Sequence, residues 1–135
     1  NLGTAYYTGA SITVPPGRWI VSTGTSIIVY NAGSNGIGAD GQLWCHIFLS
    51  SSNTNHINTT DLVPGGAIAG AGAIYRGGKY GVAVGNFLVN NTSATSHTYY
   101  LWMDTNNLGA TLSERVSTGF DNGVWERWLY AAPIN

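Results

Sequence analysis

The sequence predicts an all-β domain arranged as a two-sheet sandwich or barrel, and three observations support this prediction. No stretch of ten residues carries a helical stripe of apolar side chains. The long runs are instead rich in Thr, Val, Ile, Tyr and Trp, and Gly, Asn, Asp and Pro interrupt them at short intervals. The 135 residues are enough for one independent core, so we treat residues 1–135 as a single domain.

Turn residues divide the chain into nine expected strands. Turn signals occur at Gly9, Pro15-Pro16-Gly17, Asn35-Gly36, Asp40-Gly41, Pro64-Gly65-Gly66, Gly77-Gly78, Asn106-Asn107 and Asn122-Gly123. The expected strands are 3–7, 10–14, 18–30, 42–49, 67–75, 80–90, 97–104, 110–117 and 124–134. Segment 50–60 is almost entirely Ser, Asn and Thr and predicts a long exposed loop. The Gly/Ala-rich stretch 65–73 is ambiguous, and a strand that packs closely against another backbone is one interpretation.

Three of these strands are apolar on both faces, whereas a half-solvated strand alternates apolar and polar residues. One face of each strand suits the sandwich core, as in Leu43, Cys45, Ile47 and Leu49. The other faces carry Trp44, His46 and Phe48, then Tyr100 and Trp102, and finally Trp128 and Tyr130. A two-layer domain of this size has no third layer to cover them. We therefore expect a further copy of the same chain to cover these seven residues, as in an obligate oligomer.

Low charge excludes several classes of partner. Lys and Arg total 5 and Asp and Glu total 6, so only 8% of the residues are charged, and the polarity comes from 13 Asn, 14 Thr and 11 Ser. One lysine and four scattered arginines cannot follow a nucleic-acid backbone or an anionic membrane. No apolar run approaches the roughly 20 residues of a transmembrane segment. The single cysteine, Cys45, excludes an internal disulfide.

The start of the chain predicts a processed or excised product. It carries no basic-then-apolar signal peptide and does not begin with Met. We expect a domain excised from a longer protein.

Three segments, in their order and spacing, resemble TNF-like jelly-roll heads on viral fibres. The run ASITVPPGRWIVSTGT (10–25) resembles the family's opening, in which a short apolar strand, a Pro/Gly turn and a long aromatic-bearing strand follow one another. The run HTYYLWM (97–103) resembles its "TYYL" strand, and WLYAAPI (128–134) resembles its closing strand. The resemblance implies a ten-stranded sandwich that forms a tight homotrimer, with inner-sheet aromatic residues around a threefold axis.

The resemblance also implies a function. Phage members of this family cap fibres, spikes and tail needles. The chain is similar to the C-terminal knob of a bacteriophage tail fibre or tail needle, most closely that of a short-tailed phage. It would then be an extracellular virion structural protein without cofactor or catalytic activity, which contacts the bacterial cell surface during host attachment or membrane penetration. A stand-alone, lectin-like carbohydrate-binding sandwich is the alternative, and it needs no trimer.

Enzymatic and metal-binding patterns are weak. Residues 36–41 match the letters of a dinucleotide fingerprint, but a strand follows where a helix N-terminus is required. His46, His56 and His97 have no metal-ligand spacing within one chain. Glu114 and Glu126 permit a glycosidase pair, but salt bridges with neighbouring arginines are the simpler interpretation. No G-x-S-x-G elbow supports a hydrolase.

Two further sets of residues are candidate contacts. An arginine at a subunit interface needs a partner, so we expect Arg18, Arg76, Arg115 and Arg127 to meet a carboxylate of the adjacent chain or a small acidic ligand. The loop residues Ser50, Asn53, Asn55, His56 and Asn58 can hydrogen-bond sugar hydroxyls and form a candidate receptor loop. A solvated loop without a ligand is the simpler interpretation.

Overall fold

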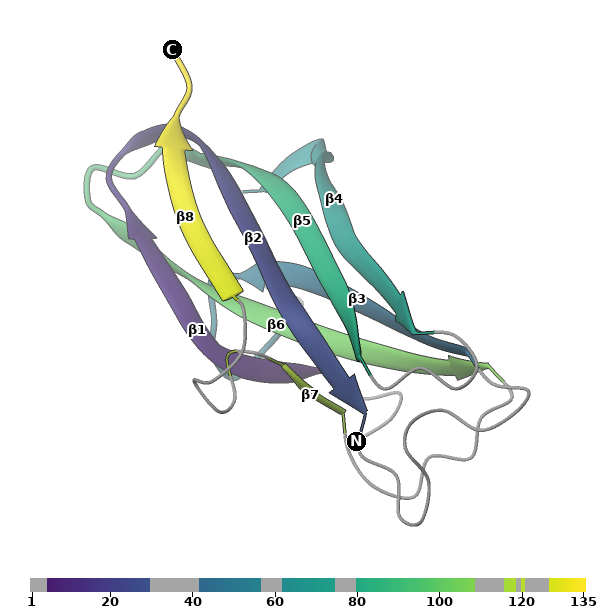
Figure 1. Ribbon diagram of the computed structural model, residues 1–135. Coiled ribbons are helices and arrows are strands. Elements are labelled where there is room, and N and C mark those ends of the chain that lie inside the picture. The colour runs from purple at the N-terminus through teal and green to yellow at the C-terminus, as the bar shows by residue number, and fades with distance from the viewer. Residues whose placement is uncertain are drawn as a thin grey trace.

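The chain forms an all-β, antiparallel sandwich. The computed structural model describes residues 5–29, 42–56, 62–74, 80–108, 116–118, 120 and 127–135. Its strands are β1 (Tyr6–Val14), β2 (Gly17–Val29), β3 (Gln42–Ser50), β4 (Leu62–Ile74), β5 (Tyr80–Asn91), β6 (His97–Leu108), β7 (Val116–Thr118) and β8 (Arg127–Pro133). Figure 1 shows β8, β2 and β5 side by side, with β1, β6 and β3 behind them at a different angle. The predicted all-β class is confirmed.

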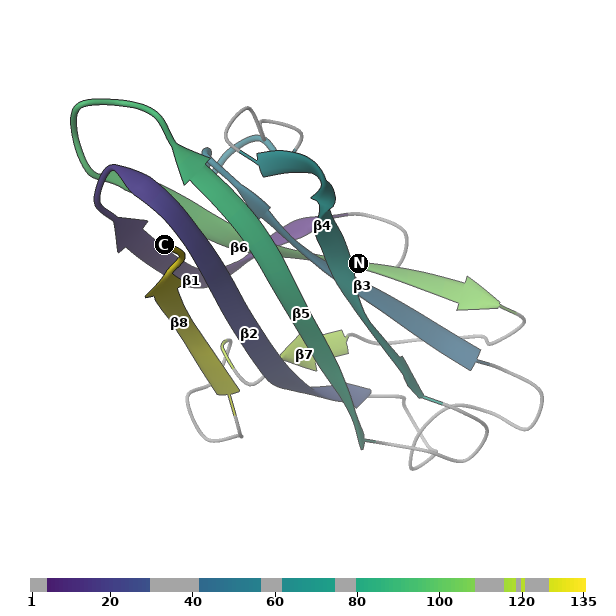
Figure 2. The same cartoon turned by 90° about the horizontal axis from the view of Figure 1, so that it is seen from above.

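Strand pairing follows a continuous antiparallel path. The order is β1-β6-β3-β4-β5-β2-β7, and β8 pairs with β2. Pairing between β4 and β5 is irregular, with register shifts between Leu62 and Ala67 and between Ile68 and Ala71. Two antiparallel groups of three strands, β1-β6-β3 and β5-β2-β8, therefore face one another, as the view from above shows (Figure 2).

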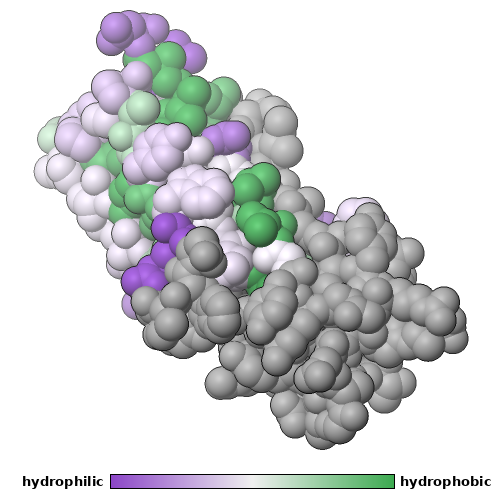
Figure 3. Space-filling model, in the orientation of Figure 1, coloured by the Kyte–Doolittle hydropathy of each residue, from purple (hydrophilic) through white to green (hydrophobic). Residues whose placement is uncertain are grey.

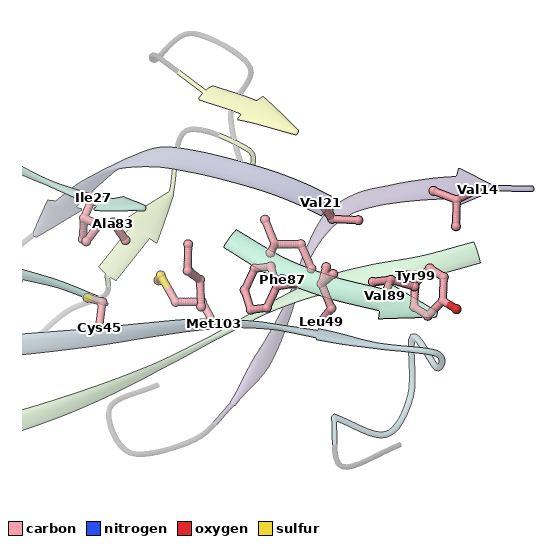
Figure 4. Packing of buried hydrophobic residues seen from close by; sticks show 12 residues of the cluster. Val14, Val21, Ile27, Cys45, Leu49, Ala83, Phe87, Val89, Tyr99 and Met103 are labelled. Atoms are coloured by element: carbon pink, nitrogen blue, oxygen red, sulfur yellow. The ribbon is translucent and has the colours of Figure 1, made fainter. Parts of the chain in front are cut away.

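The core lies between these two groups. Alternate residues of each strand point inward, because successive side chains on a strand point to opposite faces. Val21 and Ile27 from β2 meet Cys45 and Leu49 from β3, with Phe87 of β5 between them (Figure 4). Each fully buried aliphatic or aromatic side chain stabilises the fold by about 1.5–3 kcal/mol relative to an exposed one. The predicted inward faces of 43–49 and 99–104 are confirmed for Cys45, Ile47, Leu49, Tyr99, Leu101 and Met103.

Several predicted turns lie inside strands. In the structure, the expected strands 3–7 and 10–14 form one strand that begins at Tyr6. Within it, Gly9 has a φ of 85°, and the pairing with β6 shifts register between Tyr7 and Ser11. Gly9 thus forms a bulge in place of a turn. Asn106 and Asn107 continue β6, where they pair with β3, and 64–66 lies within β4. The ambiguous stretch 65–73 is therefore strand.

Strands β2, β3 and β5 agree with the predicted bounds to within a few residues, whereas most of the expected strand 110–117 lies outside the described residues. Gly17, with a φ of 128°, completes the predicted Pro-Pro-Gly turn between β1 and β2, and Trp19 Nε1 donates to Pro15 O across it at 3.0 Å. The turns at 35–36, 40–41, 77–78 and 122–123 lie outside the described residues. In the described part of the chain, no helix is long and apolar enough to cross a membrane.

Candidate functional site

The outer surfaces of the two strand groups differ, and each carries part of the predicted interface set. One is the outer side of β8, β2 and β5, which we call the apolar face. Its exposed large apolar residues are Ile20, Val82, Val84, Trp128 and Tyr130. Figure 3 shows this side, where green hydrophobic residues and pale residues of intermediate hydropathy adjoin, with only small purple areas among them.

Strand register arranges the apolar face in rows. Ala132, Ile20 and Leu88 form one row across β8, β2 and β5, since Ile20 pairs with both of the others. Further rows contain Tyr130, Ser22 and Asn86, and then Trp128, Gly24 and Val84. No residue of 20–26, 82–88 or 128–132 is charged. Two of its polar side chains pair with each other, because Ser22 Oγ donates to Asn86 Oδ1 at 2.6 Å.

Glycine at position 24 seats the ring of Trp128. Gly24 is buried although it lies on the outer side of β2, and a Cβ added there would overlap the six-membered ring of Trp128. Trp128 thus lies against the backbone of β2 at Gly24 while 42% of the residue stays exposed. This gives the face a broad aromatic centre between Tyr130 on its own strand and Val84 on the far strand.

The outer side of β1, β6 and β3 holds an aromatic cluster composed of Tyr7, Phe48, His56, Tyr100 and Trp102. Tyr7 packs edge-on against Tyr100, with ring centroids 5.5 Å apart, and lies 6.1 Å from Trp102. The His56 ring lies 5.8 Å from Phe48 and 5.7 Å from Trp102. These contacts stabilise the face within a single chain.

The cover for Trp102 comes from the same chain, so its burial does not by itself require a second copy; its predicted place in a subunit interface stays a prediction. Trp102 is only 6% exposed, and its Nε1 donates to Ser52 O at 2.9 Å. Segment 51–56 holds its shape through local bonds: Ser50 Oγ donates to Asn55 O, and the backbone N–H groups of Thr54 and Asn55 donate to Ser52 Oγ. A short polar loop that satisfies itself can therefore lie over an aromatic side chain.

The candidate receptor loop is divided by this arrangement. Ser50 is buried, whereas Asn53, Asn55 and His56 are exposed. Asn58 lies outside the described residues.

Next to the aromatic cluster, His46 and Asp104 form a cross-strand pair. They are direct partners in the β3–β6 register, and His46 Nδ1 lies 2.8 Å from Asp104 Oδ1. The two side chains are 44% and 40% exposed. Trp44 lies two residues earlier on the same face of β3 and is 37% exposed. We call Trp44, His46 and Asp104 the His–Asp patch.

The hydrogen bonds of His46 bear on a hydrolytic role for the patch. Among the described residues, no hydroxyl is hydrogen-bonded to His46, whereas a nucleophilic triad has a hydroxyl or thiol in that place. Within the same residues, no group of three or more His, Cys, Asp and Glu could hold a metal ion. Cys45, beside His46 in sequence, points to the core; burial, and secondarily the charge of Asp104, raise its pKa to about 12.

The two described members of the predicted arginine set lie far apart on the sheet. Arg18 begins β2, whereas Arg127 pairs with Thr25, seven residues further along β2, or roughly 23 Å at the rise of a strand. Both are exposed. Arg76, Arg115, Glu114 and Glu126 lie outside the described residues.

Sequence reasoning found Trp128 and Tyr130 but missed the neighbours that complete their face. Ile20, Val82, Val84 and Gly24 were not singled out, although strand 80–90 is also apolar at alternate positions on both faces. Apolar residues on both faces of a strand indicated the interface residues of β3, β6 and β8, and the same pattern would have indicated Val82 and Val84. Asp104 could be paired with His46 only once the register between β3 and β6 was known.

No protein-family model, curated protein or solved structure matches the chain. The apolar face and the outer side of β1, β6 and β3 are therefore the features of the chain that bear on its function.

Proposed function

We propose that the chain is a trimeric, TNF-like jelly-roll knob at the tip of a bacteriophage tail needle or tail fibre. In this role it locks three chains together and presents their outer loops to the bacterial envelope during attachment or penetration. The observation that carries the proposal is the apolar face. Five large apolar side chains are exposed together on three adjacent strands with no charge among them, which is typical of a surface covered by another chain.

A ring of three chains would bury a large part of each chain's surface. A standard contact buries about 800 Å² per partner, and each chain in a ring of three makes two contacts. Roughly a quarter of the chain's 6987 Å² would then be buried. With so few charges in the chain, like-charge repulsion between three identical faces is small.

Strand order supports the jelly-roll assignment. The consecutive strands β3, β4 and β5 are neighbours and β6 returns beside β3, which is the Greek-key order. The strands β2 to β5 repeat this arrangement in reverse, since β2 lies beside β5. Two overlapping Greek keys across two sheets are the pattern of a jelly roll. The apolar face would be the inner sheet of the trimer, and the His–Asp patch would face outward on each of the three chains.

Solution mass, measured by light scattering, tests the assembly. We expect three times 14.2 kDa. A monomer would favour the stand-alone carbohydrate-binding alternative, because that function needs no cover for the apolar face. Saturable adsorption of the labelled chain to bacterial envelopes tests the attachment role. A trimer that adsorbs to none of a broad panel of envelopes would contradict attachment and leave only a structural role.

A further inference from the structure

We propose that the His–Asp patch is a binding site for neutral sugars, with Trp44 as the stacking platform and the His46–Asp104 pair as the hydroxyl-binding group. The site deepens the attachment role proposed above, and it rests on that role only for the expectation that the ligand is a surface glycan. All three residues belong to one chain, so binding itself does not require assembly.

The His46–Asp104 pair keeps hydrogen-bonding atoms that a ligand can use. The bond between His46 Nδ1 and Asp104 Oδ1 fixes both side chains across the β3–β6 ladder. In the described part of the chain, neither His46 Nε2 nor Asp104 Oδ2 has a protein hydrogen-bond partner. A half-exposed, oriented imidazole–carboxylate pair therefore offers two polar atoms to a ligand with little loss of side-chain entropy on binding.

Trp44 supplies an aromatic side chain beside the His46–Asp104 pair. Same-face residues on a strand lie about 7 Å apart, so the Cα atoms of Trp44 and His46 are separated by about the length of one hexose unit with its hydroxyl groups. A sugar stacked with its C–H face on the exposed Trp44 ring would place its hydroxyl edge near the pair. Phe48 continues the line of rings on the other side of His46. Apolar surface with a few oriented polar groups is the usual composition of a small-ligand site.

The charge of the His–Asp patch determines which kind of sugar it should prefer. Asp104 is the only acidic residue among those described, and the described arginines, Arg18 and Arg127, lie on β2 and β8, in the other strand group. When a neutral His46 donates Nδ1–H to Asp104, Nε2 is an acceptor, as is Oδ2. Two acceptors and a negative charge suit neighbouring hydroxyl donors, and they repel sugar carboxylates. The site should thus prefer neutral hexoses to uronic acids.

Saturation-transfer NMR titration of the full chain tests the site with glucose, galactose, mannose, N-acetylglucosamine and glucuronic acid as probes. We expect saturable binding of at least one neutral sugar and weaker binding of glucuronic acid. Trp44→Ala should weaken neutral-sugar binding by about tenfold or more. Asp104→Asn, which keeps the side-chain size, should weaken the binding of neutral sugars. It should also narrow the difference in affinity between glucose and glucuronic acid, because it removes the negative charge.

Trp19→Phe is the control, because it replaces a partly buried tryptophan on β2 that belongs to neither the apolar face nor the His–Asp patch, and it should leave sugar binding per chain unchanged. Absence of binding to every neutral probe would overturn the inference, and so would full binding by Trp44→Ala. If Trp44→Ala does not fold, as judged by circular dichroism, Asp104→Asn decides. A trimer that binds none of the sugars overturns this inference alone, whereas a monomer that binds them overturns only the proposed assembly.

Discussion

Trp128 lies across Gly24, its direct partner in the pairing of β8 with β2, so closely that any side chain at position 24 would overlap the indole. This relationship joins the last strand to the middle of the apolar face. The ring covers backbone that would otherwise be open to water, and it leaves a flat aromatic surface for a partner chain.

Gly24→Ala should displace the Trp128 ring without unfolding the domain. The ring is partly exposed and can rotate away, so we expect a loss of about 1–3 kcal/mol in the free energy of unfolding by urea. The double variant Gly24→Ala/Trp128→Ala should recover part of this loss relative to the sum of the single variants. Strict additivity of the two changes would contradict the contact.

Val84→Glu should break assembly while preserving the fold. Val84 is exposed in the single chain, so a charge costs little there, but three carboxylates in a dry contact repel one another. Light scattering should give a monomer mass with an unchanged far-ultraviolet circular dichroism spectrum. Ser11→Lys, also exposed and on a strand but in the other group, should keep the trimer mass. Equal behaviour of the two variants would exclude the apolar face as the contact.

Trp102→Phe should loosen segment 51–56. The substitution keeps a ring in the aromatic cluster but removes the donor to Ser52 O, at a cost of about 1 kcal/mol. Trp102→Ala removes the packing as well and should cost about 3–5 kcal/mol. Hydrogen exchange of 51–56 should accelerate in Trp102→Phe while that of β2 stays unchanged. Unaltered exchange in the loop would show that the hydrogen bond does not hold it.

Alkaline pH should destabilise the protein in part through Cys45. Burial raises the pKa of this thiol to about 12 in the folded chain, while the unfolded chain releases the proton near pH 9. Below that pH the thiol is protonated in both states and has no effect. Above it the unfolded state binds fewer protons, so the free energy of unfolding falls by up to about 1.4 kcal/mol per pH unit.

Urea unfolding of the wild type and Cys45→Ala between neutral and alkaline pH measures this contribution. The stability of Cys45→Ala should fall less steeply above pH 9. Since the same tyrosines remain in both proteins, the difference in slope reports the thiol. Parallel slopes would mean that the thiol is accessible to ionisation in the folded chain.

The all-β class, most strand positions and the inward faces of β3 and β6 were predictable, because alternation along a strand is a local property of the sequence. The Gly9 bulge and the continuation of β6 through Asn106 and Asn107 were not, since pairing with neighbouring strands overrides local turn preference. The cover of Trp102 by segment 51–56 also escaped prediction. It depends on a loop folding back 50 residues away in sequence, and a Ser/Asn/Thr-rich composition does not encode that contact.

Only part of the apolar face could be predicted from the sequence. Trp128 and Tyr130 stood out as aromatic residues, but grouping them with Trp44 and Trp102 joined two faces that lie on different strand groups. Only the pairing of β2 with β5 and β8 shows that Val84 and Trp128 share one surface and that Trp44 belongs to another.

Hydroxyl-radical footprinting of the native protein shows whether other chains bury the apolar face. Trp128 and Trp44 are almost equally exposed in one chain, at 42% and 37%, so a monomer should oxidise both at similar rates. If three copies bury the apolar face, Trp128 should be strongly protected and Trp44 should remain reactive. Equal oxidation of the two tryptophans would contradict the account.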